Sequence, residues 1–321
     1  MSSFQIVVAE GVLTDVEVEA EHLSARPAEV RLASLRTAED VARETRQAHA
    51  VVVTVEPMPR SFVELLGPDV RIIARAGIGL DAIDLDAARD RGIAVFHTPD
   101  YATEEVATHT VALMLALNRK LLQGDELARK DWQSWARLKP VPPMSVLTVG
   151  IVGLGRIGRA VADRVRPFAA NIVAFDPFVT EAPDNVRLAE TLDELLAETD
   201  VLTLHLPVTD ATRGLIGARE LGLLRPGAVV VNVARGALLD QVALVGALRS
   251  GRLSGAGLDV LAVEPLPDDD PITTAPNVIL SPHFAWYSDA SNSRTRTMVV
   301  DGILDYLEGK PVSVGRLAVA P

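Results

Sequence analysis

Three residues near the ends of predicted strands carry the side chains needed for acid–base chemistry on a carboxylate-bearing molecule. Arg235 follows the apolar run 228–233, and His283 ends the segment Ser281-Pro282-His283. A guanidinium binds a carboxylate through two parallel hydrogen bonds, and an imidazole exchanges a proton near neutral pH. Glu264 can pair with His283 and favour its protonated form. The three side chains can therefore hold a carboxylate, polarise a neighbouring carbonyl and move a proton to or from its oxygen.

A glycine-rich turn precedes these residues. Gly153, Gly155 and Gly158 form G-x-G-x-x-G directly after an apolar strand and at the start of a predicted helix. The first glycine permits a tight turn, the second lets a pyrophosphate approach the backbone, and the third allows close helix–strand packing. Arg156 lies within the turn, where it can contact the pyrophosphate. We expect a dinucleotide site; a flavin site, an S-adenosylmethionine site and a glycine turn without cofactor are the alternatives.

Asp176 indicates which dinucleotide binds. It ends the next predicted strand, where a carboxylate accepts hydrogen bonds from the adenosine ribose. The 2′-phosphate of NADP would be repelled by this carboxylate, so the predicted cofactor is NAD.

These residues require an α/β framework. Short β-branched runs alternate with helical patterns along nearly the whole chain, which is typical of parallel sheets. We expect one long helix over about 104–129, a proline-rich break at 139–143 and a final helix over 289–307. The predicted strands are 5–8, 50–55, 71–74, 93–96, 148–152, 172–175, 201–206, 228–233, 254–259 and 278–281. Since the glycine turn lies mid-chain, its domain begins after residue 100, and the last helix can return to the first domain.

Composition excludes several classes of function. The net charge of -12 argues against binding to nucleic acid or to an anionic membrane. The chain has no cysteine, which excludes thiolate catalysis and a cysteine zinc site. The acidic run Asp268-Asp269-Asp270 lacks metal-site spacing, so we predict no metal and a solvated loop there. Residues 1–10 lack the pattern of a signal peptide, so we expect a cytoplasmic protein.

The order of GLGRIG, VNVARG, DVLAVEP and SPH resembles the D-2-hydroxyacid dehydrogenase family over nearly the whole chain. The resemblance implies two Rossmann-like, doubly wound parallel-sheet domains, with the NAD domain (101–287) inserted into a split substrate domain (1–100 plus 288–321). It implies a homodimer and a small anionic 2-oxo or 2-hydroxy acid as substrate. It also implies that Arg235, Glu264 and His283 are catalytic, with His283 as acid/base and Arg235 as the clamp for carboxylate and carbonyl.

Further positions follow from the same resemblance. Ile78 and Gly79 match the loop whose N–H groups hold the substrate carboxylate. The implied cofactor-binding residues are Thr110, Gly153, Gly155, Arg156, Ile157, Gly158, Asp176, Leu206, Pro207, Thr212, Val233, Ala234 and Asp259, the last near the nicotinamide. Two residues depart from the family pattern: Ala82 replaces an Asn, and Thr108 replaces a Glu in the A-E-H-T segment.

One branch of the family is especially similar. Segments 101–109 (YATEEVATH) and 282–288 (PHFAWYS) resemble the branch that contains the C-terminal binding proteins, which implies that Trp286 lines the pocket for the substrate side chain. The predicted function is an NAD-dependent D-2-hydroxyacid dehydrogenase. The alternatives are D-3-phosphoglycerate dehydrogenase as the specific enzyme and an NAD(H)-responsive corepressor-like binding protein. Formate or phosphite oxidation is disfavoured by Glu264, since formate dehydrogenases of the family have Gln there. The five histidines other than His283 need no role.

Overall fold

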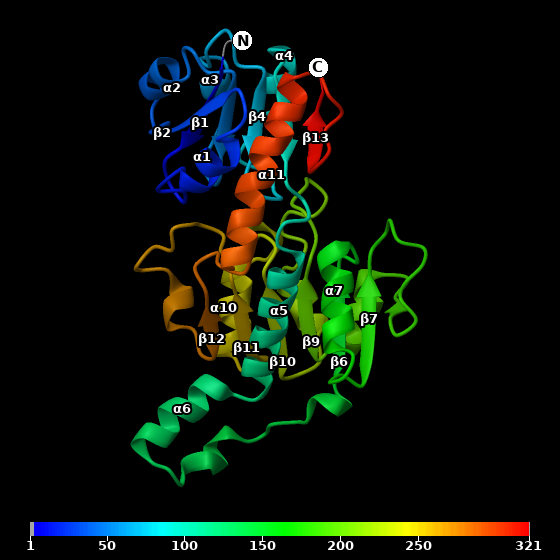
Figure 1. The fold of residues 1–321 in the computed structure, drawn as a ribbon. Helices are drawn as coiled ribbons and strands as arrows, with labels where there is room; N and C mark the ends of the chain where they lie inside the picture. Colours follow the sequence, from blue (N-terminus) through cyan, green and yellow to red (C-terminus); the bar gives the residue numbers. More distant parts are fainter. Residues whose placement is uncertain (1–2, 321) are drawn as a thin grey trace. The chain divides into compact units, whose positions relative to one another are not determined.

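The computed structural model describes residues 3–320. Contacts between residues divide the chain into two units (Figure 1). Unit 1 comprises Met1–Ala102 and Tyr287–Pro321, and unit 2 comprises Thr103–Trp286. Residues 101, 102 and 287, which the sequence prediction assigned to the inserted domain, therefore belong to unit 1.

Unit 1 is built on a sheet whose strand order, within the described residues, is β13-β5-β4-β3-β1-β2. Its strands are β1 (Phe4–Ala9), β2 (Ala28–Ala33), β3 (Ala50–Val53), β4 (Ile72–Arg75), β5 (Ala94–His97) and β13 (Arg316–Val319). Its helices are α1 (Glu17–Leu23), α2 (Ala38–Glu44), α3 (Arg60–Val63), α4 (Leu85–Asp90) and α11 (Asp289–Leu307). β1 to β5 are parallel in the flavodoxin-like order, and β13 is antiparallel to β5.

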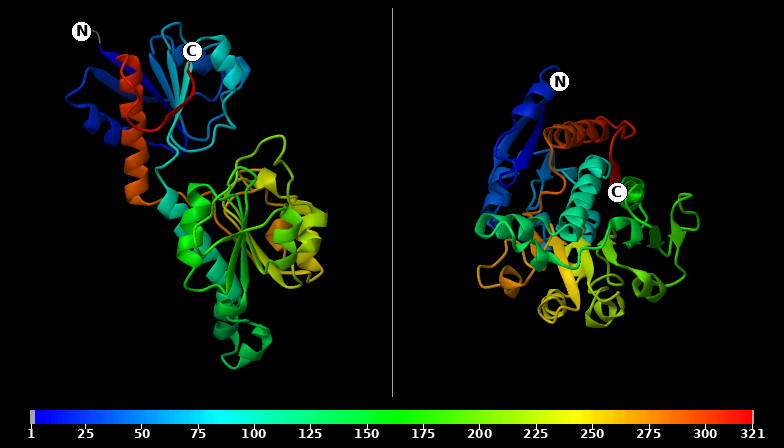
Figure 2. Two further views of the ribbon diagram at one scale, coloured as in Figure 1. Left: turned by 90° about the vertical axis from the view of Figure 1, so that its right-hand side faces the viewer. Right: turned by 90° about the horizontal axis from the view of Figure 1, so that it is seen from below.

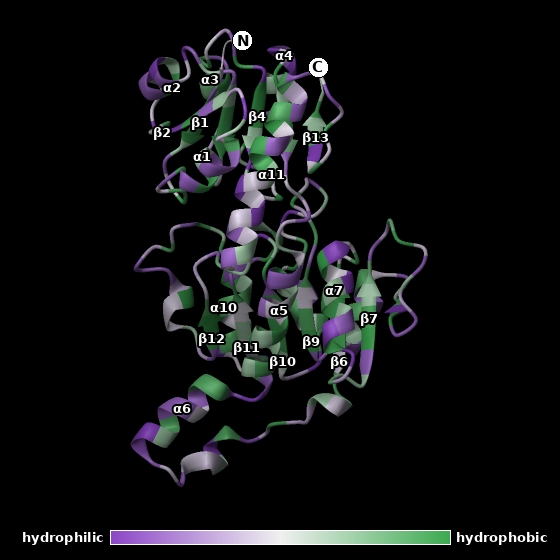
Figure 3. Ribbon diagram, in the orientation of Figure 1, coloured by the Kyte–Doolittle hydropathy of each residue, from purple (hydrophilic) through white to green (hydrophobic). Residues whose placement is uncertain are grey.

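Alternate residues along the strands of unit 1 belong to two hydrophobic cores, one on each face of the sheet. In β1, Val7 and Ala9 belong to the core that includes residues of α2, α3 and α4. Ile6 and Val8 belong to the opposite core, which includes residues of α1 and α11. Successive strand side chains point to opposite faces, so a sheet buried on both faces needs apolar residues at nearly every position. Figure 3 shows this as predominantly green strands.

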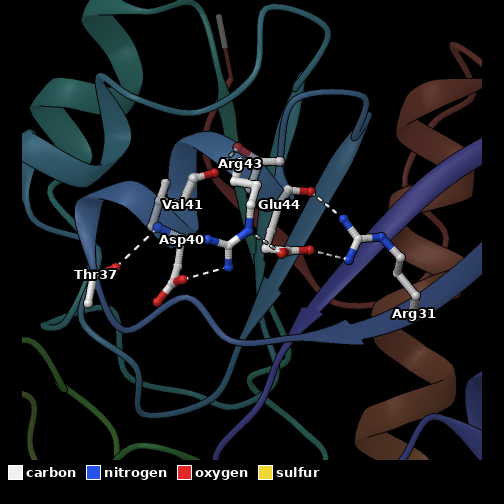
Figure 4. A network of polar contacts seen from close by, with 7 residues as sticks. Arg31, Thr37, Asp40, Val41, Arg43 and Glu44 are labelled. Carbon is white, nitrogen blue, oxygen red and sulfur yellow. Dashed lines mark hydrogen bonds and ion pairs between the residues drawn. The ribbon is translucent and has the colours of Figure 1, made fainter.

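Polar contacts hold α2 beside the edge strand β2 (Figure 4). Thr37 caps α2 by accepting a hydrogen bond from the N–H of Asp40 (3.1 Å), which satisfies one of the free donors of the first turn. At the other end of α2, Glu44 accepts a hydrogen bond from Arg31 of β2 (2.6 Å). The sequence-based strand list omitted β2, because its Glu29 and Arg31 face solvent at the sheet edge and reduce the apolar signal.

Unit 2 contains the second sheet, with the order β12-β11-β10-β9-β6-β7-β8 within the described residues. Its strands are β6 (Thr148–Val152), β7 (Asn171–Phe175), β8 (Arg187–Leu188), β9 (Val201–Leu204), β10 (Ala228–Asn232), β11 (Leu253–Leu258) and β12 (Val278–Leu280). Its α-helices are α5 (Thr103–Asn118), α6 (Leu121–Lys130), α7 (Arg156–Val165), α8 (Leu192–Glu198), α9 (Ala218–Leu223) and α10 (Gln241–Arg249). All pairs are parallel, and the chain order reverses between β6 and β9.

Small residues in β11 set how closely α5 packs on this sheet. A Cβ atom at Gly257 would lie 3.1 Å from Cβ of Leu113, and one at Gly255 would lie 3.0 Å from Cδ2 of Leu117. The alternate residues Ala256 and Leu258 face the core formed with α8, α9 and α10. Helices thus cover both faces of the sheet, as Figure 1 shows for α5 and α7 on one side. The predicted α/β fold with two Rossmann-like parallel sheets is confirmed.

The prediction of one helix over 104–129 is wrong. The structure has two helices, α5 and α6, because Lys120 between them has the left-handed backbone angle φ 52°. Residues 121–146, here called the arm, comprise α6 and the segment that returns to β6, and they extend from the body of unit 2 (Figure 2). Helix α1 and strand β13 were also absent from the sequence prediction; both are short and carry several charged or exposed residues.

Candidate active site

The glycine-rich turn lies at the carboxyl end of β6, next to the point where the strand order reverses. Gly153 has φ +93°, and a Cβ atom there would lie 2.6 Å from the carbonyl oxygen of His205, which follows β9. A Cβ atom at Gly158 would lie 2.1 Å from the carbonyl oxygen of Gly153. Both positions therefore exclude larger residues, in agreement with the packing roles predicted for them.

The start of α7 fits the pyrophosphate of a dinucleotide. Gly155 is the N-cap of α7, and no side chain of the described residues caps this helix end. A Cβ atom at Gly155 would find no heavy atom of residues 3–320 within 4 Å, so the space in front of it is open. The first N–H groups of Arg156, Ile157 and Gly158 can thus meet an anion at the positive end of the helix dipole.

Asp176 links the glycine-rich turn to the end of β7. Its Oδ2 accepts a hydrogen bond from the N–H of Leu154 (2.9 Å), and its Oδ1 accepts one from the N–H of Phe178 (3.0 Å). A carboxylate has about four acceptor sites, so these two bonds leave capacity for ribose hydroxyls. Asp176 is held in place by its contacts with the backbone before any ligand binds.

The loop after β9 contains three of the predicted cofactor-binding residues. Thr212 donates a hydrogen bond to the carbonyl oxygen of Pro207 (2.7 Å), which closes the loop that begins with His205 and Leu206. Part of His205 reaches the surface, but its Nδ1 is buried and has no hydrogen-bond partner among the described residues. Burial lowers the pKa of His205 from 6.5 to about 3, so the ring is neutral at physiological pH.

This neutral histidine predicts an acid-dependent loss of stability. The unfolded chain takes up a proton at His205 below pH 6.5, whereas the folded protein does so only near pH 3. Folded stability should therefore fall as the pH decreases between these values, by up to about 1.4 kcal/mol per pH unit from this group. His205→Gln should remove this contribution. Urea unfolding of both proteins at pH 7, 6 and 5 measures it, and equal slopes against pH would contradict the prediction.

A buried asparagine shapes the turn that carries Arg235. Oδ1 of Asn232 accepts a hydrogen bond from the N–H of Ala234 (3.0 Å), and its Nδ2 donates one to the carbonyl oxygen of Arg235 (2.8 Å). Arg235 also donates to the carbonyl oxygen of Ala234 (2.7 Å). The sequence prediction did not include Asn232, although a polar residue inside the run AVVVNV was a detectable signal. Of the two predicted cofactor residues before Arg235, Val233 is buried and Ala234 is partly exposed.

Glu264 and His283 are in direct contact. The distance between His283 Nδ1 and Glu264 Oε2 is 2.7 Å, and each side chain is about one third exposed. Because a carboxylate only accepts, Nδ1 is the donor and Nε2 is left to exchange a proton with a ligand. Burial raises the pKa of Glu264, but hydrogen bonds from His283 and from the N–H of Leu261, together with the charge of Arg235, outweigh burial and lower that pKa overall. The carboxylate is therefore ionised at neutral pH.

Asp259 anchors the loop that carries His283. It is buried, and its Oδ1 accepts hydrogen bonds from Ser281 Oγ (2.5 Å) and from the N–H of Phe284 (2.8 Å). Its Oδ2 accepts one from the N–H of Ala285 (2.9 Å). The N–H of His283 donates to the carbonyl oxygen of Asp259 (2.9 Å) while His283 has φ +53°, a conformation that costs a non-glycine residue about 1–2 kcal/mol. The hydrogen bonds that Asp259 accepts thus hold His283 in a strained backbone geometry.

His109 extends this network, although the sequence prediction gave it no role. Its Nε2 lies 3.0 Å from Ser281 Oγ. Since the Ser281 hydroxyl donates to Asp259, its oxygen accepts from His109, and the three residues form a chain from α5 to the His283 loop. The neighbouring Thr110, predicted to contact cofactor, is fully buried and donates to the carbonyl oxygen of Val106 (2.7 Å). Trp286, which follows the anchored loop, is partly buried.

Ile78 and Gly79, which the sequence predicts to bind the substrate carboxylate, belong to unit 1 and follow β4. The carbonyl oxygen of Ile78 accepts a hydrogen bond from His97 Nδ1 (3.0 Å), and that of Gly77 accepts one from the N–H of Thr98 (3.1 Å). Within residues 3–320, the N–H groups of Ile78 and Gly79 donate no hydrogen bond. Two adjacent backbone donors on a loop of fixed shape can bind a carboxylate.

The part of the chain that the structure describes contains no group of three or more His, Asp or Glu side chains placed to hold a metal ion. No helix in residues 3–320 is both long enough and apolar enough to cross a membrane.

Comparison with known proteins identifies relatives over nearly the whole length of the chain. D-3-phosphoglycerate dehydrogenase of Archaeoglobus fulgidus is 34% identical over 96% of this chain and 58% of the relative, so the chain spans little more than half of that protein. The structure is similar to D-lactate dehydrogenase from Aquifex aeolicus complexed with NAD and lactic acid, with a TM-score of 0.88, 29% identity and coverage of 98% of this chain and 99% of the other.

A second solved structure has a different cofactor. NADPH-dependent glyoxylate/hydroxypyruvate reductase from Sinorhizobium meliloti, in complex with NADP and malonate, has a TM-score of 0.83, 30% identity and coverage of 98% of this chain and 97% of the other. The profile of the D-isomer specific 2-hydroxyacid dehydrogenase, NAD binding domain, matches residues 111–285. This match covers more than half of the chain and includes the glycine-rich turn, Asp176, Arg235, Glu264 and His283. The chain therefore belongs to the D-isomer specific 2-hydroxyacid dehydrogenase family.

Proposed function

We propose that the chain is an NAD-dependent enzyme that interconverts a small 2-oxo acid and the corresponding D-2-hydroxy acid. The observation that carries the proposal is the 2.7 Å contact between His283 Nδ1 and Glu264 Oε2, which leaves Nε2 as the proton-exchanging atom. Histidine paired with an ionised carboxylate is a suitable proton donor to the oxygen of a reacting carbonyl. Membership of the family and the charge of Arg235 near this pair support the same proposed activity.

Each residue has a separate task in this proposal. Arg235 binds the substrate carboxylate and polarises the carbonyl, while the N–H groups of Ile78 and Gly79 donate to the carboxylate. A nicotinamide held by the glycine-rich turn and Asp176 would supply the hydride that C2 of the 2-oxo acid receives. His283 donates the proton on Nε2 to the carbonyl oxygen and becomes neutral, which yields the hydroxyl group. Glu264 keeps the ring oriented by accepting the hydrogen bond from Nδ1. In the oxidation direction, neutral His283 accepts the same proton.

The direct test is a screen of NADH oxidation with a panel of 2-oxo acids. The panel includes glyoxylate, hydroxypyruvate, pyruvate, 3-phosphohydroxypyruvate and 2-oxo acids with longer apolar side chains. Since the family position implies that Trp286 lines the side-chain pocket, we expect faster turnover with a bulky apolar substrate than with glyoxylate. Tight NADH binding without reduction of any panel member would contradict the proposal and favour an NAD(H)-responsive binding protein. Turnover restricted to 3-phosphohydroxypyruvate would identify the phosphoglycerate enzyme.

Asp176 predicts a preference for NADH over NADPH. Its fixed carboxylate at the end of β7 suits ribose hydroxyls and repels a 2′-phosphate. We expect kcat/KM to be at least about tenfold higher with NADH, the ratio that about 1.4 kcal/mol of repulsion produces. Asp176→Asn keeps an acceptor for a backbone N–H but removes the charge, so it should reduce this ratio. Faster turnover of the wild-type protein with NADPH would contradict the cofactor assignment.

The arm supports a homodimer. Its exposed apolar side chains include Trp132 (84% exposed), Trp135 (62%) and Val146 (61%), together with Leu121 and Leu122 of α6. A cluster of large apolar side chains on an extended segment is typical of a protein interface, and we infer that a second copy of the chain covers it. Because NAD(H) is an intracellular cofactor, we also infer a cytoplasmic location.

Replacing Trp132 and Trp135 together with serine is therefore expected to weaken the dimer. Buried tryptophans commonly contribute more than 1 kcal/mol each to an interface, so the dissociation constant should rise at least about tenfold. Light scattering coupled to size exclusion, at several protein concentrations, measures the change. Phe178→Ser is the matched control, since Phe178 is 94% exposed but lies outside the arm. An unchanged dimer in the double variant would contradict the role of the arm.

A further inference from the structure

The segment 261–264, which ends in Glu264, packs against the core of unit 2 through Leu261. Ala262, Val263 and Glu264 are exposed, and Leu261 is only partly buried. Val263, the largest apolar side chain among the exposed three, is 57% exposed. The three residues after Leu261 have no buried side chain, so their position depends largely on hydrogen bonds to the backbone.

Gln241, the first residue of α10, makes a bridge to this segment. Its Oε1 accepts a hydrogen bond from the N–H of Ala262 (3.2 Å). Its Nε2 lies 2.9 Å from each carboxylate oxygen of Asp270. Oδ1 of Asp270 also accepts from the N–H of Ile272 (2.9 Å), and Ile272 is buried in the core of unit 2. The bridge therefore joins the exposed segment to the core through two side chains.

The two ends of the bridge need a side chain that can both accept and donate a hydrogen bond, as an amide does. The N–H of Ala262 can only donate, and the Asp270 carboxylate can only accept. A side chain between them must offer an acceptor to one and a donor to the other. Glu lacks the donor and Lys lacks the acceptor, whereas Gln supplies both. Asp270 was predicted from the sequence to belong to a solvated acidic loop; the structure instead gives it two specific partners, because residues 241 and 270 meet only in the folded chain.

The same backbone segment touches both catalytic loops. The N–H of Leu261 donates to Glu264 Oε1 (2.8 Å), and Glu264 Oε2 contacts His283. On the other side, a Cβ atom at Gly236 would lie 1.9 Å from the carbonyl oxygen of Leu261, so the backbone next to Arg235 lies directly against the segment. A displacement of residues 261–262 would therefore move Glu264 relative to both His283 and Arg235.

We propose that Gln241 is a positioning residue for catalysis: its bridge between Asp270 and Ala262 sets the alignment of Glu264 with His283 and Arg235. The proposal deepens the proposed function and relies on it for the kinetic readout. The side chain of Gln241 acts through the backbone of residues 261–262, and Asp270 completes the bridge.

Reversing the polarity of the bridge tests this role. Gln241→Glu places two carboxylates together, and we expect it to lower kcat about tenfold, in the range that coupled neighbours show, with little change in KM. Adding Asp270→Asn restores a donor opposite the new carboxylate at position 241 and keeps an acceptor for the N–H of Ile272. The double variant should recover kcat to within about threefold of wild type. Gln241→Met, which removes both hydrogen bonds at similar volume, should resemble Gln241→Glu and serves if the latter does not fold.

A second readout is independent of turnover. Hydrogen exchange of the backbone amides of residues 260–264 should accelerate in Gln241→Glu and Gln241→Met and return toward wild type in the double variant. Gln5→Glu is the matched control, because Gln5 also donates through its amide to a carboxylate, that of Glu29 (3.1 Å), but lies in β1 of unit 1. It should change neither readout.

The outcomes separate the two proposals. If the wild-type protein reduces no 2-oxo acid, the proposed function fails, while exchange at residues 260–264 still decides whether Gln241 positions the segment. Unchanged exchange in Gln241→Glu and Gln241→Met would overturn the positioning role. A loss of kcat that the double variant does not recover would overturn it as well, since the effect would then not pass through the bridge.

Discussion

Replacing His283 with alanine is expected to lower kcat for 2-oxo acid reduction by about 10² to 10⁴-fold, the usual contribution of a general acid. In the folded protein His283 Nδ1 donates to Glu264 (2.7 Å), so in the proposed function Nε2 is the atom that exchanges a proton with the substrate oxygen. Alanine removes this proton and leaves the nascent alkoxide to be neutralised by water. NADH binding should be preserved, because the hydrogen bonds described for His283 are made to Glu264, Asp259 and Ser281 rather than to Asp176 or the glycines of the turn.

Measurements of kcat and of the NADH dissociation constant for the same variant test this expectation. His22→Gln is a matched control, since His22 also contacts a carboxylate, that of Asp301 (2.9 Å), but lies in α1 of unit 1. The control should keep wild-type kcat. Full activity in His283→Ala would show that another group is the proton donor and would refute the role assigned to His283.

Replacing Arg235 with lysine is expected to lower kcat/KM by about 10² to 10³-fold, the cost of losing one oriented donor at a reacting oxygen. Lysine keeps the positive charge but not the planar fork that binds a carboxylate through two bonds. The turn that carries Arg235 is held by Asn232, which bonds the backbone of Ala234 and Arg235. A lysine side chain at this fixed position should not reproduce the orientation of the guanidinium. Arg235→Ala should lose more, because the charge is also removed.

Steady-state kinetics with a substrate from the 2-oxo acid panel measure this loss. The comparison variant is Arg225→Lys, in which a guanidinium paired with Asp200 (2.9 Å) on the surface is replaced. Surface ion pairs contribute little to stability, so kcat/KM should stay near the wild-type value there. Equal kcat/KM for Arg235→Lys and wild type would exclude a two-point clamp by Arg235.

Short-range patterns in the sequence predicted much of the fold. Apolar runs flanked by turn residues led to β6 at its observed limits and to α11 over residues 289–307. The predictions of secondary structure were incomplete or wrong where the local sequence pattern was weak. The edge strand β2 carries charged residues, and the break at Lys120 depends on one backbone angle inside a continuous helical pattern. Hydrophobic periodicity and local composition do not reveal a helix break or an edge strand that depends on one or two residues.

The chemical groups of the candidate site and the family of this protein could be recognised in the amino-acid sequence. The glycines of the turn, Asp176 and the residues Arg235, Glu264 and His283 were all recognisable, because each lies in a short motif whose spacing is local. The residues that support these groups became evident from the folded structure. Asn232 under the Arg235 turn, Asp259 with Ser281 and His109 under His283, and the Gln241–Asp270 bridge all pair groups through specific folded geometry. Buried polar groups must find hydrogen-bond partners in the folded chain, and which partner each finds depends on how distant loops meet.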